Sequence, residues 1–322
     1  MNMKKIGILT SGGDSPGMNA AIRAVVRSAI YYGIKPYGIN SGYEGLIDGD
    51  IEELKIWSVS DILQKGGTIL KTSRSDRFRT PEGLQAAYEV LKELEIEALV
   101  VIGGDGSLKG ALNLSKLGMP VMGLPGTIDN DLGYTDFTIG FDTAVNTVLD
   151  AISNVRDTSS SHERTVIIEV MGRDCGDIAL HAGLAGGAEY ILIPEKEVNI
   201  DELCKKVVQG RNRGKSHSII IKAEGIEIPS QKLADMIKER TGLETKIVVL
   251  AYIQRGGSPT ARDRIIASKM GHKAVQLLKD GVTNRAIGIS GTQIVDYHIE
   301  EALNMKRAYE KEIVELTYIL SI

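Results

Sequence analysis

The chain alternates short apolar runs with longer segments of helical period. The apolar runs predict buried strands at residues 4–10, 36–39, 98–102, 121–124, 165–170, 190–193 and 218–221. Apolar residues recur at helical spacing in the segments between them, over residues 18–30, 84–94, 140–161, 176–186 and 260–279. Successive strand–helix units are typical of doubly wound parallel sheets. We therefore predict an α/β fold. Because no linker, repeat or composition break interrupts the pattern, we expect two interleaved domains, each a largely parallel sheet flanked by helices.

Composition narrows the class of protein. The 322 residues are 43% hydrophobic and 25% charged, which is ordinary for a globular chain with an ample core. A net charge of -4 provides no basic field, so we expect no nucleic-acid partner. The two cysteines, Cys175 and Cys204, offer no disulfide framework. No apolar run approaches the roughly 20 residues of a membrane helix, and we see no leader segment at the N-terminus. We expect a cytoplasmic protein without a membrane partner.

The segment 125–131, PGTIDND, follows the predicted strand at 121–124. If it stays extended, Thr127, Asp129 and Asp131 point to one side. One hydroxyl and two carboxylates would then enter the ligand cleft that forms at strand ends in α/β sheets. An Asx-rich turn that merely closes the strand is the alternative.

Four predicted strand ends, that one included, carry glycines beside single polar groups. These turns are Gly12-Gly13, Gly103 to Ser107, Gly126 to Asp131, and Gly172-Arg173. Glycines let the backbone approach a polyphosphate closely, and free N–H groups at a helix start attract anions. Asp105 fits a magnesium contact, because magnesium takes one or two carboxylates together with phosphate oxygens. A helix N-cap is its alternative role.

Arginines placed beside glycines or strand ends are candidate phosphate clamps. They are Arg74, Arg164, Arg173 and Arg255. For each one alone, a surface salt bridge is the commoner role, and a solvated loop is the default interpretation of the polar run 71–77 that holds Arg74. Arg23 and Arg27 lie one turn apart on one helix face.

Taken in order, the motifs TSGGDSPGMNAAIR, GGDGS, PGTIDND, SSSHERT, MGRDCGD, AEG and QRGGSPT resemble those of the bacterial ATP-dependent 6-phosphofructokinase family over nearly the whole chain. The resemblance implies that the protein phosphorylates fructose 6-phosphate at its 1-hydroxyl with Mg²⁺-ATP, the committed step of glycolysis. It implies an ATP-binding domain of residues 1–140 plus 254–304 and a sugar-phosphate-binding domain of residues 141–253 plus 305–322. It also implies a homotetramer with shared active and effector sites.

By resemblance, Asp129 is the general base, and Thr127 and Arg173 contact the transferring phosphoryl group. The implied ATP site consists of Gly13, Arg74, Ser75, Gly104, Asp105, Gly106 and Ser107, with Asp105 as the magnesium ligand. The implied sugar site consists of Thr127, Ile128, Asp129, Arg164, Met171, Gly172, Arg173, Glu224, Lys246, Tyr252 and Arg255, with Arg164 reaching it from a neighbouring subunit. The implied effector site, for ADP or phosphoenolpyruvate, consists of Arg23, Arg27, Arg156, Gly187, Glu189, Arg213, Lys215 and His217.

Four positions bear on the substrates. Pyrophosphate-dependent relatives have Asp at position 106 and Lys at position 126, where this chain has glycines, so we expect room for the α-phosphate of ATP. The family usually has Arg at position 246 and His at position 252, where this chain has Lys246 and Tyr252. A pyrophosphate-dependent enzyme and a kinase of another phosphosugar, such as tagatose 6-phosphate, therefore remain alternatives. A non-catalytic nucleotide- or sugar-phosphate-binding subunit is a further one.

Overall fold

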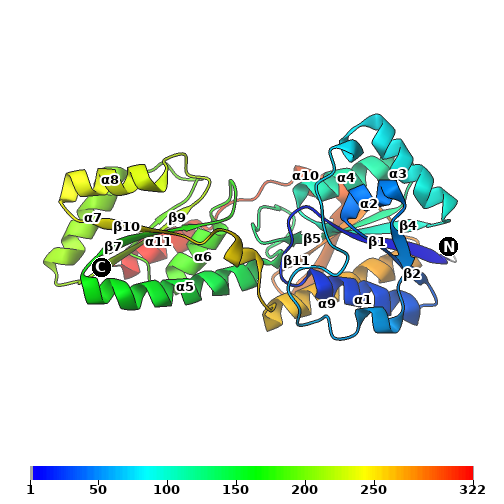
Figure 1. Ribbon diagram of the computed structural model, residues 1–322, viewed down its shortest axis with the longest axis horizontal. Helices are drawn as coiled ribbons and strands as arrows, with labels where there is room; N and C mark the ends of the chain where they lie inside the picture. Colours follow the sequence, from blue (N-terminus) through cyan, green and yellow to red (C-terminus); the bar gives the residue numbers. More distant parts are fainter. Residues whose placement is uncertain (1–2, 322) are drawn as a thin grey trace. The chain divides into compact units, whose positions relative to one another are not determined.

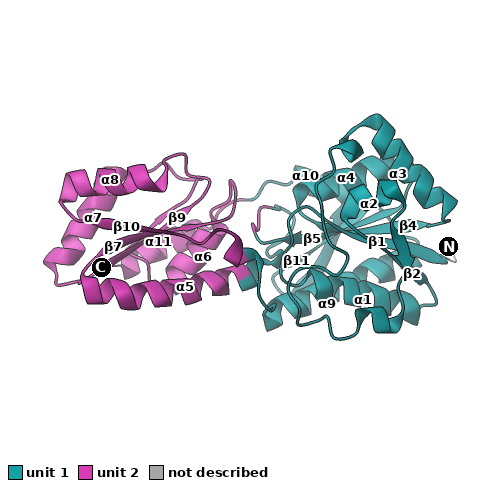
Figure 2. Ribbon diagram, viewed as in Figure 1, with its two compact units in different colours: residues 1–128, 132–143, 255–307 teal, residues 129–131, 144–254, 308–322 magenta. Residues whose placement is uncertain are grey.

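A computed structural model describes residues 3–321. The chain forms two compact units, coloured separately in Figure 2. Unit 1 contains residues 1–128, 132–143 and 255–307, and unit 2 contains residues 129–131, 144–254 and 308–322. The chain thus passes from one unit to the other within the PGTIDND segment.

Unit 1 is built on a largely parallel sheet. Its strand order is β12 (Gln293–His298), β11 (Arg285–Ser290), β5 (Val121–Thr127), β4 (Ala98–Gly103), β1 (Lys5–Ser11), β2 (Lys35–Ile39) and β3 (Ile51–Glu53). The outer strands β12 and β3 are antiparallel to their neighbours. The short strand β6 (Ile139–Gly140) pairs with the end of β5. Every residue of β4 and β5 is buried, which explains their unbroken apolar character.

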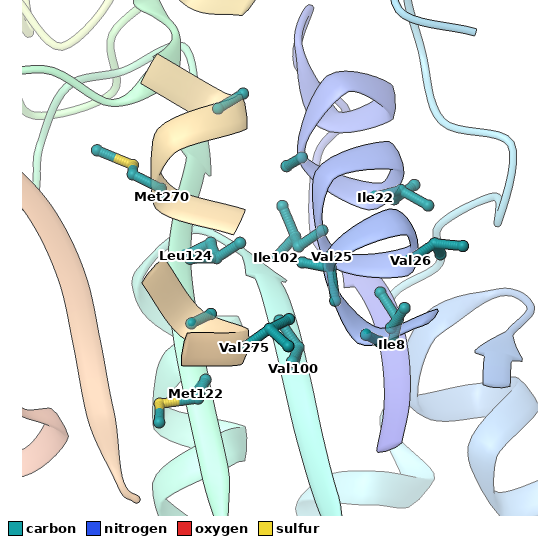
Figure 3. Packing of buried hydrophobic residues seen from close by; sticks show 14 of the residues in the cluster. Ile8, Ile22, Val25, Val26, Val100, Ile102, Met122, Leu124, Met270 and Val275 are labelled. Carbon is teal, nitrogen blue, oxygen red and sulfur yellow. The ribbon is translucent and has the colours of Figure 1, made fainter. Parts of the chain in front are cut away.

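Helices cover both faces of this sheet (Figure 1). One face packs against α1 (Met18–Tyr31) and α9 (Ala261–Lys279). Figure 3 shows this core, in which Val25 of α1 and Val275 of α9 meet strand residues such as Val100 and Ile102. The other face carries α2 (Gly42–Asp48), α3 (Pro81–Glu93), α4 (Asp105–Lys116) and α10 (Ile299–Asn304). Short 3-10 helices occupy Ile56–Val59 and Arg77–Arg79.

Unit 2 has a parallel sheet with the order β10 (Thr245–Val249), β7 (Thr165–Val170), β9 (Ser218–Ala223) and β8 (Tyr190–Leu192). Helices α7 (Ile200–Asn212) and α8 (Ser230–Thr241) share a core with this sheet. The remaining helices of the unit are α5 (Phe141–His162), α6 (Asp177–Ala185) and α11 (Lys311–Leu320). A 3-10 helix spans Ala251–Arg255. The predicted α/β class, with two mostly parallel sheets flanked by helices, is confirmed.

Within residues 3–321, no helix is long and apolar enough to cross a bilayer.

Candidate active site

In unit 1 the site forms where three parallel strands end together. Ser11 of β1 pairs with Gly103 of β4, and Gly103 pairs with Pro125 of β5. The glycine-rich segments that follow these strands therefore leave the same edge of the sheet. This is the edge at which open α/β sheets bind ligands.

The first segment, after β1, is shaped by glycines. Gly12 has a φ of 88° and Gly17 a φ of 105°, values that residues with a Cβ rarely adopt. A Cβ at Gly13 would lie 2.3 Å from Nη1 of Arg255, so the guanidinium occupies the space that a side chain would fill. Nη1 of Arg255 also donates to the carbonyl oxygen of Asp14 at 3.3 Å. Arg255, assigned by resemblance to the sugar, thus contacts the predicted ATP loop in this structure.

The second segment joins β4 to α4. Asp105 is the first residue of the helix, and its carboxylate pairs with Nζ of Lys109 at 2.7 Å. A Cβ at Gly106 would meet no atom within 4 Å, so this side of the turn is open. Ser107 is buried, and its carbonyl oxygen accepts a bond from the Tyr43 hydroxyl at 2.6 Å. The turn is held from behind while its outer side stays accessible.

The third segment corrects two expectations. Strand β5 ends at Thr127, a bend follows, and Asn130 has a φ of 53°, so the segment 127–131 is not extended and the predicted alternation of side chains fails. Ile128 is fully buried. Gly126 does not open onto free space, because a Cβ there would lie 3.0 Å from methyl carbons of Ile102 and Met18. Of the two glycines taken as leaving room for the donor, only Gly106 does so.

Thr127 lies beside the second turn, since a Cβ at Gly104 would be 3.6 Å from the Thr127 Cβ. Thr127 itself is 8% exposed.

Arg74 is exposed, and the Ser75 hydroxyl bonds to the carboxylate of Glu44 and accepts from the backbone N–H of Phe78. Ser75 therefore shapes the 71–77 loop from within.

In unit 2, Asp129 and Arg173 come together. Nε of Arg173 lies 3.2 Å from Oδ2 of Asp129, whose side chain is 1% exposed. Glu224 fixes the turn that joins β7 to α6. Its Oε1 accepts from the backbone N–H groups of Gly172 at 3.2 Å and Arg173 at 2.9 Å. Gly172 has a φ of 134°, and a Cβ would lie 2.4 Å from the carbonyl oxygen of Cys175. The turn thus holds the guanidinium against the buried carboxylate.

A cavity of about 270 Å³ lies at the carboxyl ends of β7, β9 and β10. Its lining consists of Glu169, Val170, Met171, Glu224, Val249, Ala251 and Tyr252. Two carboxylates and a phenol hydroxyl suit a hydroxyl-rich ligand. Met171, Glu224 and Tyr252, all predicted sugar contacts, are brought together here.

Arg164 and Lys246 lie elsewhere. Arg164 immediately precedes β7, and Lys246 pairs with Val166 near the start of that strand. The cavity is at the other end of the same strands, where Val249 pairs with Glu169. At about 3.3 Å per residue, Lys246 is about 10 Å from Val249 along β10. Within one subunit these two cations do not reach the cavity.

The predicted effector residues of unit 2 form two contacting groups. Nη1 of Arg156 lies 3.3 Å from Nε2 of His217, and Nη2 donates to the Gly187 carbonyl oxygen at 3.2 Å. Nζ of Lys215 lies 3.4 Å from Oε1 of Glu189. Arg213 ends α7 and is exposed. Arg23 and Arg27 lie on α1 in unit 1, where burial and the neighbouring Arg27 charge lower the pKa of Arg23.

Residues 3–321 contain no cluster of three or more His, Cys, Asp or Glu side chains that would hold a metal alone. A magnesium ion that is also coordinated by phosphate oxygens needs only one or two protein carboxylates. The partly exposed Asp105 carboxylate, at an open turn, fits that requirement.

Three buried polar groups of unit 2 had no predicted role. The side chain of Gln254 is fully buried and accepts from the backbone N–H of Met171 at 3.1 Å. The Asn130 amide donates to Asp177 at 2.8 Å. Lys222, 2% exposed, lies 3.1 Å from Glu169 on the cavity wall. Gln254 and Asp177 lie within the motifs QRGGSPT and MGRDCGD, on which the family resemblance rests. Lys222 is a charged residue in an otherwise apolar strand, and this was the signal that could have identified it.

Comparison with known proteins agrees with this geometry. The phosphofructokinase family model matches residues 5–278. The ATP-dependent 6-phosphofructokinase of Alkaliphilus metalliredigens is 62% identical over 99% of this chain and 100% of its own, and that of Clostridioides difficile is 58% identical over the same shares. The solved phosphofructokinase from Saccharomyces cerevisiae superposes with a TM-score of 0.89 at 36% identity, over 99% of this chain and 48% of its own.

Proposed function

Since this chain belongs to the phosphofructokinase family, we propose that it transfers the γ-phosphoryl group of ATP to the 1-hydroxyl of fructose 6-phosphate. The products are ADP and fructose 1,6-bisphosphate, and the reaction is the committed step of glycolysis. The observation that carries this proposal is the full-length identity of 62% to a relative described as an ATP-dependent 6-phosphofructokinase. We place the enzyme in the cytoplasm.

Asp129 acts as the general base. Its carboxylate is buried beside the Arg173 guanidinium and accepts the proton of the sugar hydroxyl. Arg173 remains half-exposed and also contacts the transferring group, together with Thr127. Because phosphoryl transfer is loose, the two residues contribute mainly by positioning and by balancing the charge on the phosphoryl oxygens.

ATP binds at the sheet edge of unit 1. Gly13 and the Gly104–Ser107 turn present backbone N–H groups to its phosphates, and the loop with Arg74 and Ser75 borders the nucleotide. Asp105 would hold the magnesium ion, which would neutralise phosphate charge there.

The sugar binds in unit 2 at the cavity of about 270 Å³. Met171, Gly172 and Glu224 contact its hydroxyls, and Tyr252 serves its 6-phosphate. Arg164 and Lys246 serve that phosphate from a neighbouring subunit. Their position at the far end of β7 and β10 supports this assignment, because no side chain spans the distance within one chain. The active enzyme is accordingly a homotetramer with composite sites.

ADP and phosphoenolpyruvate regulate the enzyme at a second site. In unit 2 it contains Arg156, Gly187, Glu189, Arg213, Lys215 and His217, and Arg23 and Arg27 come from a neighbouring subunit. The cations suit phosphate groups, and Glu189 suits the metal of a nucleotide complex.

One set of assays tests both the phosphoryl donor and the identity of the sugar acceptor. Purified protein is assayed for fructose 1,6-bisphosphate with ATP and with pyrophosphate, and activity with pyrophosphate alone would overturn the donor assignment. Comparing kcat/KM for fructose 6-phosphate and tagatose 6-phosphate tests the second candidate, which Lys246 and Tyr252 favour. Ligand binding without transfer from either donor would identify a non-catalytic subunit.

A further inference from the structure

Asp263 is a fully buried acid that the proposed reaction leaves without a role. It lies in the first turn of α9, three residues after the capping residue Thr260. Its Oδ1 accepts from the backbone N–H of Gly140 at 2.9 Å. Its Oδ2 accepts from the backbone N–H of Thr143 at 2.9 Å and from the Thr143 hydroxyl at 2.5 Å. Three donors from the β6–α5 junction thus converge on one carboxylate.

This junction is connected to the transfer segment. Gly140 of β6 pairs with Thr127 at the end of β5. The Thr138 hydroxyl, just before β6, donates to the Thr127 carbonyl oxygen at 2.7 Å. Thr127 is therefore held on one side by β6, a strand of two residues whose pairing alone is too short to fix its position. The Asp263 carboxylate fixes β6 through its hydrogen bond from Gly140.

The same junction supports the glycine-rich loop after β1. A Cβ at Gly17 would lie 2.7 Å from Ile139 and 3.6 Å from the Asp263 Cβ. A Cβ at Gly140 would lie 2.6 Å from the Ser15 Cβ. The loop, β6 and the start of α9 pack so closely that a shift of β6 must move both phosphate-facing segments.

We propose that Asp263 is a positioning residue for phosphoryl transfer, and that its ionised carboxylate locks β6 in the place that fixes Thr127 and the glycine-rich loop. This inference rests on the roles proposed above for Thr127 and Asp129. Its physical basis is that displacing reacting groups by about 1 Å costs on the order of 100-fold in rate.

The anchor is sensitive to pH. Burial raises the pKa of Asp263 to about 6, while the bonds from Thr143 and Gly140 act in the opposite direction. The nearby Asp142 carboxylate also raises it. The two arginines that flank Asp263 in sequence are engaged elsewhere, since Arg262 lies over the Phe137 ring and Arg264 bonds to Pro259 and Ser258. A protonated Asp263 places an O–H where Thr143 donates, so the lock weakens below about pH 6.

The test is Asp263→Asn, with kcat and KM measured from about pH 5 to 8. We expect kcat at pH 8 to fall roughly 10- to 100-fold with smaller changes in KM, and the acid limb near pH 6 to disappear. The matched control is Asp296→Asn, the same chemical change in the same unit. Its carboxylate pairs with Arg285, the first residue of β11, at 2.7 Å and with Lys273, ten residues after Asp263 on α9, at 3.9 Å. Its kcat and acid limb should remain those of the wild type.

If Asp263→Asn does not fold, Thr143→Val is the second variant. It removes the hydroxyl that donates to Asp263 and accepts from the backbone N–H of Thr260, and the acid limb should move up by about one pH unit because the ionised form loses a hydrogen bond. Wild-type kcat in Asp263→Asn, or an unmoved limb in Thr143→Val, overturns the inference. Asp129→Asn distinguishes a failure of the anchor role of Asp263 from a failure of the proposed general base. If it is inactive while both anchor variants behave like Asp296→Asn, only the anchor role fails; if it is fully active, the proposed base fails.

Discussion

Lys222 allows a quantitative test of the cavity wall in unit 2. Its ammonium is buried, with 2% of the side chain exposed, and lies 3.1 Å from Oε2 of Glu169. The Ser230 hydroxyl bonds to the same oxygen. Removing the cation by Lys222→Met leaves the carboxylate of Glu169 with the Ser230 hydroxyl but without its cationic partner. The stem of the new side chain keeps its apolar contacts.

Breaking a buried ion pair costs about 3–5 kcal/mol. Glu169 is 23% exposed, so water partly solvates the remaining charge, and we expect the lower figure of roughly 2–3 kcal/mol. Adding Glu169→Gln removes the orphaned charge, so the double variant should recover most of the loss. The coupling energy between the two sites should be about 1–3 kcal/mol.

Urea unfolding followed by far-ultraviolet circular dichroism measures these differences, because Trp57 lies in unit 1 and does not report on this pair. Lys246→Met is the matched control: its pair with Glu244 at 3.5 Å is more than half exposed, and we expect a loss below about 1 kcal/mol. A Lys222→Met loss no larger than the control, or a double variant equal to the sum of the singles, would refute the reasoning.

Four further predictions concern activity and pH. Asp129→Asn should lower kcat by roughly 10²–10⁴-fold at unchanged fold, measured by product formation and circular dichroism, because the sugar proton loses its acceptor. Gly106→Asp should reduce kcat/KM for ATP at least about tenfold, since a carboxylate then enters the open side of the turn; an unchanged value would place ATP elsewhere. Tyr252→His should raise kcat/KM for fructose 6-phosphate, measured against tagatose 6-phosphate. Finally, burial disfavours the ionised Asp263 by more than its three hydrogen bonds favour it, so stability and activity should respond to pH in opposite directions. The raised pKa of Asp263, about 6 against 3.8 unfolded, adds stability that is complete below pH 3.8 and is lost as the pH rises through about 6, where the active, ionised form becomes populated. The free energy of unfolding should fall by on the order of 3 kcal/mol across this window, and Asp263→Asn should abolish that slope in urea titrations.

Much of the fold follows from local pattern. The strand predicted at 165–170 matches β7 as Thr165–Val170, and the helix predicted at 140–161 matches α5 as Phe141–His162. The helix α5 is long enough to show its helical period, and β7 is a short run rich in β-branched residues, buried except at Glu169. The short strands β3 and β6 were not predicted, because two or three residues carry no period and exist only through pairing with β2 and β5.

The candidate site, like the fold, was predictable in part from the sequence. Residue types and their order along the chain were sufficient to identify the family, since phosphate binding requires glycines, arginines and carboxylates at strand ends. For the segment after Thr127 the sequence left an extended strand and an Asx-rich turn as alternatives. The structure shows a bend with a left-handed Asn130, whose amide bonds to Asp177, 47 residues away. The crowding at Gly126 also comes from Ile102 and Met18, distant in sequence.

By itself, the sequence determined the α/β class, the family and the chemical types at the site, because these depend on composition and spacing along the chain. Only the tertiary structure revealed the cavity lined by Glu169 and Tyr252, the separation of Lys246 from it, and the anchor at Asp263. These features depend on which strand ends adjoin and on which donors converge on one buried carboxylate. Packing between distant segments decides both.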